Sequence, residues 1–174
     1  MAESDRVMPA SLVEAHREPF DHRDGSGVDF EPYQEFLSEA ETADWWHSWT
    51  GNPAVHGAEF RVFGQDGTGG LAAFWLVREG GLLGEQPVVF LGSEGEVGVV
   101  AGAADGYLWL LADGFGPLEA ISYPQHEHEP RVDARLTEIA ERWAPSARQP
   151  ASEVITAARA EFPNFEETVR SQCR

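Results

Sequence analysis

The chain has 174 residues, of which 42% are hydrophobic and 11% aromatic, and its formal net charge is -18 at pH 7. That apolar content suffices for one hydrophobic core and excludes a disordered chain. The excess of carboxylates excludes direct binding to nucleic acid or to an anionic membrane, since both require a positively charged surface, and it makes a basic protein the natural partner.

The N-terminal residues 1–30 predict a loosely ordered, acidic arm, followed by a single α+β domain over residues 31–174. Within the arm, only a few apolar residues such as Leu12 and Ala15 suggest a helical turn. The single Cys173 cannot form an internal disulfide, and the sequence has neither a signal-peptide pattern nor an apolar run of about 20 residues. These features predict a soluble, cytoplasmic protein without a membrane span.

A helix is predicted after the arm. Apolar side chains recur at helical spacing over residues 31–40, and Pro32 suits a first helical turn. Ser38 and Glu41 have the S-x-x-E spacing of a capping box, so we expect the helix to restart there and to continue towards Trp49.

Four consecutive strands are predicted over residues 58–101. The runs EFRVFG and LAAFWLVR flank the turn QDGTGG, and PVVFL and VGVV flank GSEGE, whose glycines permit positive φ. The first turn is read as a hairpin rather than a phosphate loop, because no Lys follows it and no helix opens there. Alternation places Phe60 and Val62 on the same sheet face as Phe74. Trp75 is left for the opposite face.

Helices are predicted to follow the strands and to cover the sheet. Apolar residues have helical spacing in the run DGYLWLL from residue 105, and again over residues 132–143 and 154–162. Strands joined by short turns, with helices before and after them, are typical of the α+β class. We therefore predict one antiparallel sheet of about four to six strands rather than alternating βαβ units.

The loop PQHEHEP suggests one alternative, a metal-dependent enzyme. His126 and His128 alternate with Glu127 and Glu129, and imidazoles and carboxylates are common metal ligands. Alternating side chains on an extended loop point in opposite directions, however, so a solvated loop is the favoured interpretation. The sequence therefore assigns no catalytic, cofactor-binding or metal-binding residue.

Three segments resemble the SUKH superfamily, which includes a fungal cell-wall-synthesis regulator and many bacterial proteins encoded beside polymorphic toxins. They are WTGN at residues 49–52, EFRVFGQDGTGGLAAFW at 59–75 and PVVFLGSEGEVGVVAGAADGYLWLLADG at 87–114, and the span from residue 49 to residue 114 is about two fifths of the chain. Their order is more specific than any one segment. The resemblance implies an α+β domain with an antiparallel sheet, no enzymatic activity and no cofactor.

For bacterial members, the resemblance implies an immunity protein that binds and neutralises a cognate toxin, often a nuclease or deaminase, in the producing cell. A nuclease presents a basic cleft to its phosphate substrate, so an acidic inhibitor is steered towards it. We expect Asp66, Glu94 and Glu96 to contact this partner, because hairpin tips protrude. Two alternatives stay open: these carboxylates serve only solubility, or the protein is an intracellular regulatory or scaffold module without a toxin partner.

Overall fold

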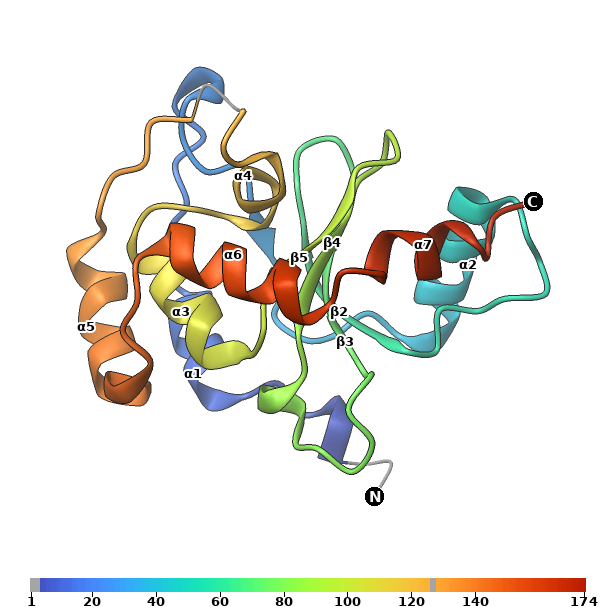
Figure 1. Ribbon diagram of the computed structural model, residues 1–174, viewed down its shortest axis with the longest axis horizontal. Coiled ribbons are helices and arrows are strands. Elements are labelled where there is room, and N and C mark those ends of the chain that lie inside the picture. The colour runs from blue at the N-terminus through green and yellow to red at the C-terminus, as the bar shows by residue number, and fades with distance from the viewer. Residues whose placement is uncertain (1–3, 126–127) are drawn as a thin grey trace.

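One five-stranded antiparallel sheet lies between two layers of helices in the computed structural model, which describes residues 4–125 and 128–174 (Figure 1). The strands follow one another across the sheet in chain order. This architecture confirms the predicted α+β class. The elements of the described residues are η1 Ser4–Arg6, α1 Ala10–Ala15, η2 Arg23–Gly25, β1 Glu31–Pro32, α2 Glu39–Thr50, β2 Phe60–Gln65, β3 Leu71–Trp75, η3 Leu83–Glu85, β4 Val88–Leu91, β5 Val97–Ala101, α3 Ala104–Ala112, α4 Pro117–Ser122, α5 Ala134–Trp143, η4 Pro145–Ala147, α6 Ala151–Glu161 and α7 Phe165–Arg170.

The sheet is buried on both of its faces. The larger core lies between one face and the layer that contains α1, α3, α4 and α5, and the smaller core lies between the other face, α2 and α7 (Figure 1). At the sheet's edge, α4, α6 and α7 contact β5. Burial on both faces explains why β3 and β4 are almost continuous apolar runs, without the alternation of a half-exposed strand.

The N-terminal segment is not the loosely ordered arm that the sequence predicted. Leu12 and Ala15 of α1 are fully buried, and they belong to the same core as Leu110 of α3. This helix packs against α3 and α5. The prediction was wrong because α1 is short and its few apolar residues are stabilised by segments that are distant in sequence. Residues 1–3 of the predicted arm lie outside the described residues.

The helix α2 begins later than predicted. The capping box is confirmed, since Ser38 Oγ accepts from the Glu41 amide at 3.2 Å and the Glu41 carboxylate accepts from the Ser38 amide at 2.9 Å. The helical prediction for residues 31–40 is otherwise wrong, because Glu31–Pro32 forms β1, and the Tyr33 amide then donates to the Phe63 carbonyl at 2.8 Å. The backbone there is bonded to the edge of β2, which an apolar spacing alone does not reveal.

The predicted faces of the first hairpin also need correction. Phe60 pairs with Trp75, and Val62 pairs with Ala73. Directly paired residues of antiparallel strands share a face, so Phe60 and Val62 lie in the smaller core with Trp75, whereas Phe74 lies in the larger core. A register difference of one residue reverses every face, and the turn and a bulge after Val62 set that register.

A candidate binding surface at two hairpin turns

Two hairpin turns meet at one end of the sheet. Residues 66–70 join β2 to β3, and residues 92–96 join β4 to β5; we call them the paired turns. Because Leu71 of β3 pairs with Leu91 of β4, the two turns emerge side by side (Figure 1). Ser93 Oγ donates to Thr68 Oγ1 at 2.9 Å, which joins one turn to the other.

Asp66, which the sequence placed at a protruding tip, is instead buried, with 3% of its surface exposed. One of its carboxylate oxygens accepts from the Thr68 amide at 2.9 Å, from the Thr68 hydroxyl at 2.8 Å and from the Gly70 amide at 2.8 Å. Its carboxylate therefore holds the turn in shape and is not presented to a partner. The D-G-T-G-G pattern, which is typical of an Asp that binds its own turn, was the signal for this role.

Glu94 and Glu96 are exposed on the second turn. Gly95 between them has φ +100°, a conformation that favours glycine, and it allows the chain to reverse sharply here. Beside this turn, the Arg170 guanidinium donates to the Gly95 carbonyl at 3.0 Å and to Glu166 at 2.8 Å. The structure thus separates the three predicted residues: two carboxylates face solvent at the turn, and one is structural.

Two tryptophans of α2 hold the paired turns, a role that the sequence did not indicate. The Trp45 indole N–H donates to the Gly69 carbonyl at 3.2 Å, and the Trp49 indole N–H donates to the Gly92 carbonyl at 2.7 Å. Their rings stack with centroids 6.0 Å apart and an interplanar angle of 16°. The i,i+4 spacing of these residues was the available signal, because it places both indoles on one helix face. Each turn therefore has an anchor of its own.

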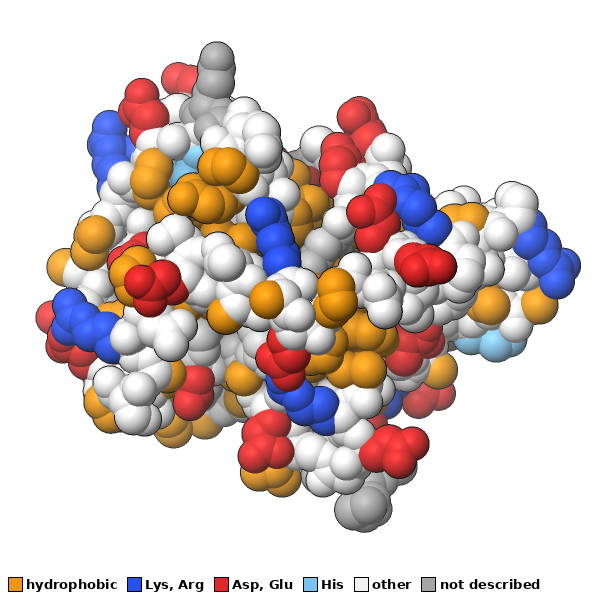
Figure 2. Space-filling view, viewed as in Figure 1, with side chains coloured by type: hydrophobic (Ala, Val, Ile, Leu, Met, Phe, Trp, Pro, Cys, Tyr) orange, Lys and Arg blue, Asp and Glu red, His pale blue; other side chains and the backbone are white. Residues whose placement is uncertain are grey.

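Further carboxylates add to the negative charge around the paired turns. Asp29 accepts from the Gly67 amide at 2.9 Å, and the Glu31 carboxylate accepts from the side chain of Gln65 at 3.0 Å. Figure 2 shows carboxylates in red over the projecting turn between β4 and β5, with a basic side chain in blue beside them. The surface thus combines fixed backbone geometry with an excess of negative charge.

The polar loop around residue 126 shows no metal centre among the described residues. His126 and Glu127 lie outside them. The His128 Nε2–H donates to the Gly114 carbonyl at 2.7 Å, and the Glu129 amide donates to the Ser26 carbonyl at 3.1 Å. Within residues 4–125 and 128–174, no group of three or more His, Cys, Asp or Glu side chains is placed to hold a metal ion.

Two titratable side chains lie in the interior of the protein. His16 is packed against the rings of Phe30 and Phe63, and its Nε2 lies 3.4 Å from the Tyr107 hydroxyl oxygen. Burial lowers the pKa of His16 to about 3. Burial raises the pKa of Glu119, whose carboxylate accepts two backbone N–H bonds. Both side chains are buried and out of reach of a partner, so we assign both to the stability of the fold.

Comparisons with protein-family models, with curated proteins and with solved structures find no match to this chain. Among the helices of the described residues, none combines the length and the apolar character needed to cross a bilayer. The candidate surface therefore has to be interpreted from its own geometry and charge.

Proposed function

We propose that this protein is an immunity protein, which binds a basic toxin domain of the nuclease or deaminase type through the paired turns and blocks it in the producing cell. The single observation that carries the proposal is the second turn, where Glu94 and Glu96 face solvent on a backbone that hydrogen bonds fix in place. The resemblance of residues 49–114 to the SUKH superfamily supports the same function.

The charge of the protein favours rapid association with such a partner. With 30 acidic and 12 basic side chains, the chain attracts a basic surface from a distance. Steering of this kind raises association rates from about 10⁵–10⁶ M⁻¹s⁻¹ to as much as about 10⁸–10⁹ M⁻¹s⁻¹ at low salt. A nuclease cleft is basic because it binds phosphate, so the protein competes with nucleic acid for the same surface.

The anchored turns favour tight binding as well as rapid association. A rigid tip loses little conformational entropy when a partner binds it. Trp49 and Arg170 both donate to carbonyls of the second turn, and the first turn supports it through Thr68. We therefore expect the tip to enter the partner's cleft without rearrangement.

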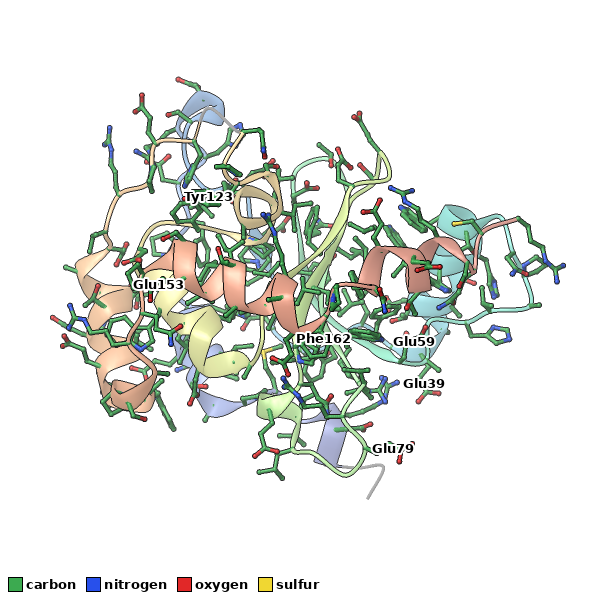
Figure 3. The ribbon with its side chains drawn as sticks, in the orientation of Figure 1. Glu39, Glu59, Glu79, Tyr123, Glu153 and Phe162 are labelled. Atoms are coloured by element: carbon green, nitrogen blue, oxygen red, sulfur yellow. The ribbon has the colours of Figure 1, made fainter. Side chains whose placement is uncertain are left out.

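The test compares two double variants that change the net charge equally. Glu94→Arg/Glu96→Arg alters the second turn, and Glu79→Arg/Glu153→Arg alters exposed sites far from it, which Figure 3 labels. Stopped-flow association is measured at low and high salt with a basic toxin domain of the nuclease or deaminase type, namely the one that the tagged protein captures from a lysate of its native cells. We expect the turn variant to associate about tenfold more slowly than the control at low salt, with the difference lost at high salt.

Each result of this experiment has a defined meaning. Equal slowing in both variants would show that only overall charge matters, and it would remove the paired turns as the contact surface. If the unmodified protein neither bound nor inhibited the toxin domain, the immunity function would be wrong. Inhibition assays with a nucleic acid substrate test directly whether the protein blocks the toxin domain.

A further inference from the structure

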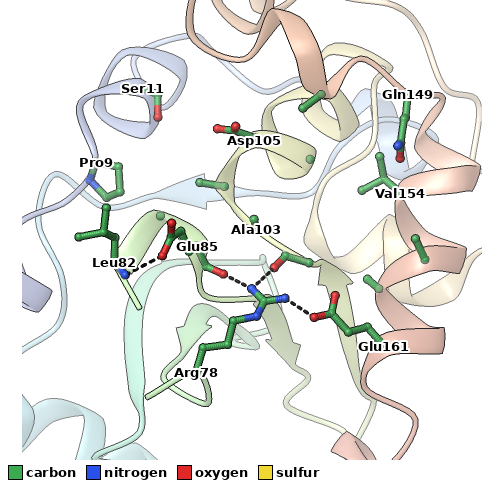
Figure 4. Close-up of a pocket in the computed structure, with 17 residues that line it drawn as sticks. Pro9, Ser11, Arg78, Leu82, Glu85, Ala103, Asp105, Gln149, Val154 and Glu161 are labelled. Carbon is green, nitrogen blue, oxygen red and sulfur yellow. Dashed lines mark hydrogen bonds and ion pairs between the residues drawn. The ribbon is translucent and has the colours of Figure 1, made fainter. Parts of the chain in front are cut away.

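A groove of about 680 Å³, drawn in Figure 4, lies where β3 ends and β4 begins, which is the end of the sheet opposite to the paired turns. Five segments form its walls: the start of α1, residues 78–85 between β3 and β4, the turn from β5 into α3, residues 147–149 before α6, and the length of α6. It is open to solvent along its length. Its size lies within the range of pockets that bind ligands in proteins.

The groove is lined mainly by small apolar side chains. Ala104 and Ala158 are buried at its base with Val154, and Ala157 lies in the wall with an exposed surface. At the rim, Leu82 is 73% exposed and adds an apolar side chain to the opening of the groove. Side chains this small leave the space between α3 and α6 open, so an apolar group from another molecule would be removed from water there.

Arg78 fixes one end of the groove. Its guanidinium donates to the carbonyls of Glu85 and Gly102 and forms an ion pair with Glu161, and it lies over the Phe162 ring at 5.2 Å (Figure 4). One side chain thus joins the 78–85 segment, the turn before α3 and the end of α6. The shape of the groove therefore does not depend on a partner being present.

The charge of the groove favours a basic occupant. Three carboxylates line it, those of Glu85, Asp105 and Glu161, against the single guanidinium of Arg78, which is already paired with Glu161. An occupant that matches this surface is apolar on one side and carries Lys or Arg at its flanks. A helix with an apolar face is the secondary structure that binds apolar grooves in this way.

We propose that the groove binds a short amphipathic segment of the partner protein, with its apolar face on the alanines of α3 and α6 and its basic residues towards Glu85 and Asp105. The inference rests on the proposed function in assigning this segment to the basic toxin. It adds a second contact surface, at the opposite end of the sheet from the paired turns. A partner that spans both surfaces gains from two linked contacts.

The test uses two fluorescent peptides of Leu and Lys with the same composition. One has all its leucines on one helical face, and the other has them distributed around the helix. Anisotropy titrations are made with the unmodified protein, with Ala157→Trp, which fills the groove, and with Ala160→Trp, which is exposed on the same helix outside it. We expect the amphipathic peptide to bind at least about tenfold more tightly than the other, and only Ala157→Trp to abolish that preference.

Several results would overturn this inference. If attraction to an acidic protein were the whole effect, the two peptides would bind with equal affinity. If Ala160→Trp changed peptide binding as much as Ala157→Trp does, the groove would not be the binding site. If an amphipathic peptide with Glu in place of Lys bound as tightly as the Leu and Lys peptide, the proposal that the occupant is basic would be wrong. Self-association that Ala157→Trp abolishes would identify a second copy of the chain as the occupant instead.

Failure of the groove and failure of the proposed function are distinguishable. The peptide titration contains no toxin, and the Glu94→Arg/Glu96→Arg variant leaves every residue that lines the groove unchanged. If the peptides show no preference while the turn variant still slows association with the toxin domain, the groove inference is wrong and the immunity function stands.

Discussion

Replacement of His16 by Phe is expected to remove a large part of the protein's sensitivity to mild acid. The pKa of this buried imidazole falls from an ordinary 6.5 to about 3. In the folded protein His16 therefore stays neutral at a pH at which the unfolded chain binds a proton. Its contribution to stability is complete above about pH 6.5 and is lost as the pH falls towards 3.

The size of this effect follows from the two pKa values. Each pKa unit corresponds to about 1.36 kcal/mol, so the full loss by pH 3 is about 5 kcal/mol, and the loss between about pH 7.5 and pH 5 is about 2 kcal/mol. The loss of about 2 kcal/mol at pH 5 is a substantial part of the free energy of unfolding of a typical domain, which is about 5–15 kcal/mol.

Urea denaturation at the two pH values measures this effect. The free energy of unfolding is expected to fall by about 2 kcal/mol less in His16→Phe than in the unmodified protein. His22→Phe is the control, because it makes the same substitution at a histidine that is exposed on the surface. A parallel pH dependence in His16→Phe and the unmodified protein would refute the reasoning. If His16→Phe does not fold, an NMR titration of the His16 ring that shows a pKa near 6.5 would refute it equally.

Two further predictions concern the paired turns. Asp66→Ala leaves the Thr68 and Gly70 amides without their acceptor, so we expect a loss of about 1–3 kcal/mol in the free energy of unfolding, measured by chemical denaturation. An unchanged midpoint would show that Asp66 does not hold the turn. Trp49→Phe keeps the ring stack but removes the bond to the Gly92 carbonyl, and it should cost about 1 kcal/mol and speed hydrogen exchange of the Gly92 amide, which donates to the Glu96 carbonyl. Exchange at the original rate would contradict the anchoring role of Trp49.

Local signals in the sequence predicted most of the elements. The glycine-rich turns between β-branched runs indicated both hairpins, and Ser38 with Glu41 marked the start of α2. These signals depend on residues within about one turn of the chain, so a single sequence contains them. The same applies to α3, whose apolar run extends over the whole helix.

Features that depend on distant contacts were missed. The burial of Leu12 requires α3 and α5, and the extended conformation at Tyr33 requires the neighbouring β2. For the candidate site, the sequence correctly predicted exposed carboxylates at Glu94 and Glu96, but not the burial of Asp66. The D-G-T-G-G pattern of the first turn held the signal for that burial, but the prediction considered only that hairpin tips protrude.

The two edges of the sheet limit how another chain can join it. At one edge, β1 has only two residues, and one of them is Pro32, which has no amide hydrogen to donate. At the other edge, α4 lies so close to β5 that a Cβ at Gly98 would be 2.9 Å from an atom of Ile121. Strand addition from a second protein is therefore disfavoured at both edges, which protects the sheet from edge-to-edge aggregation.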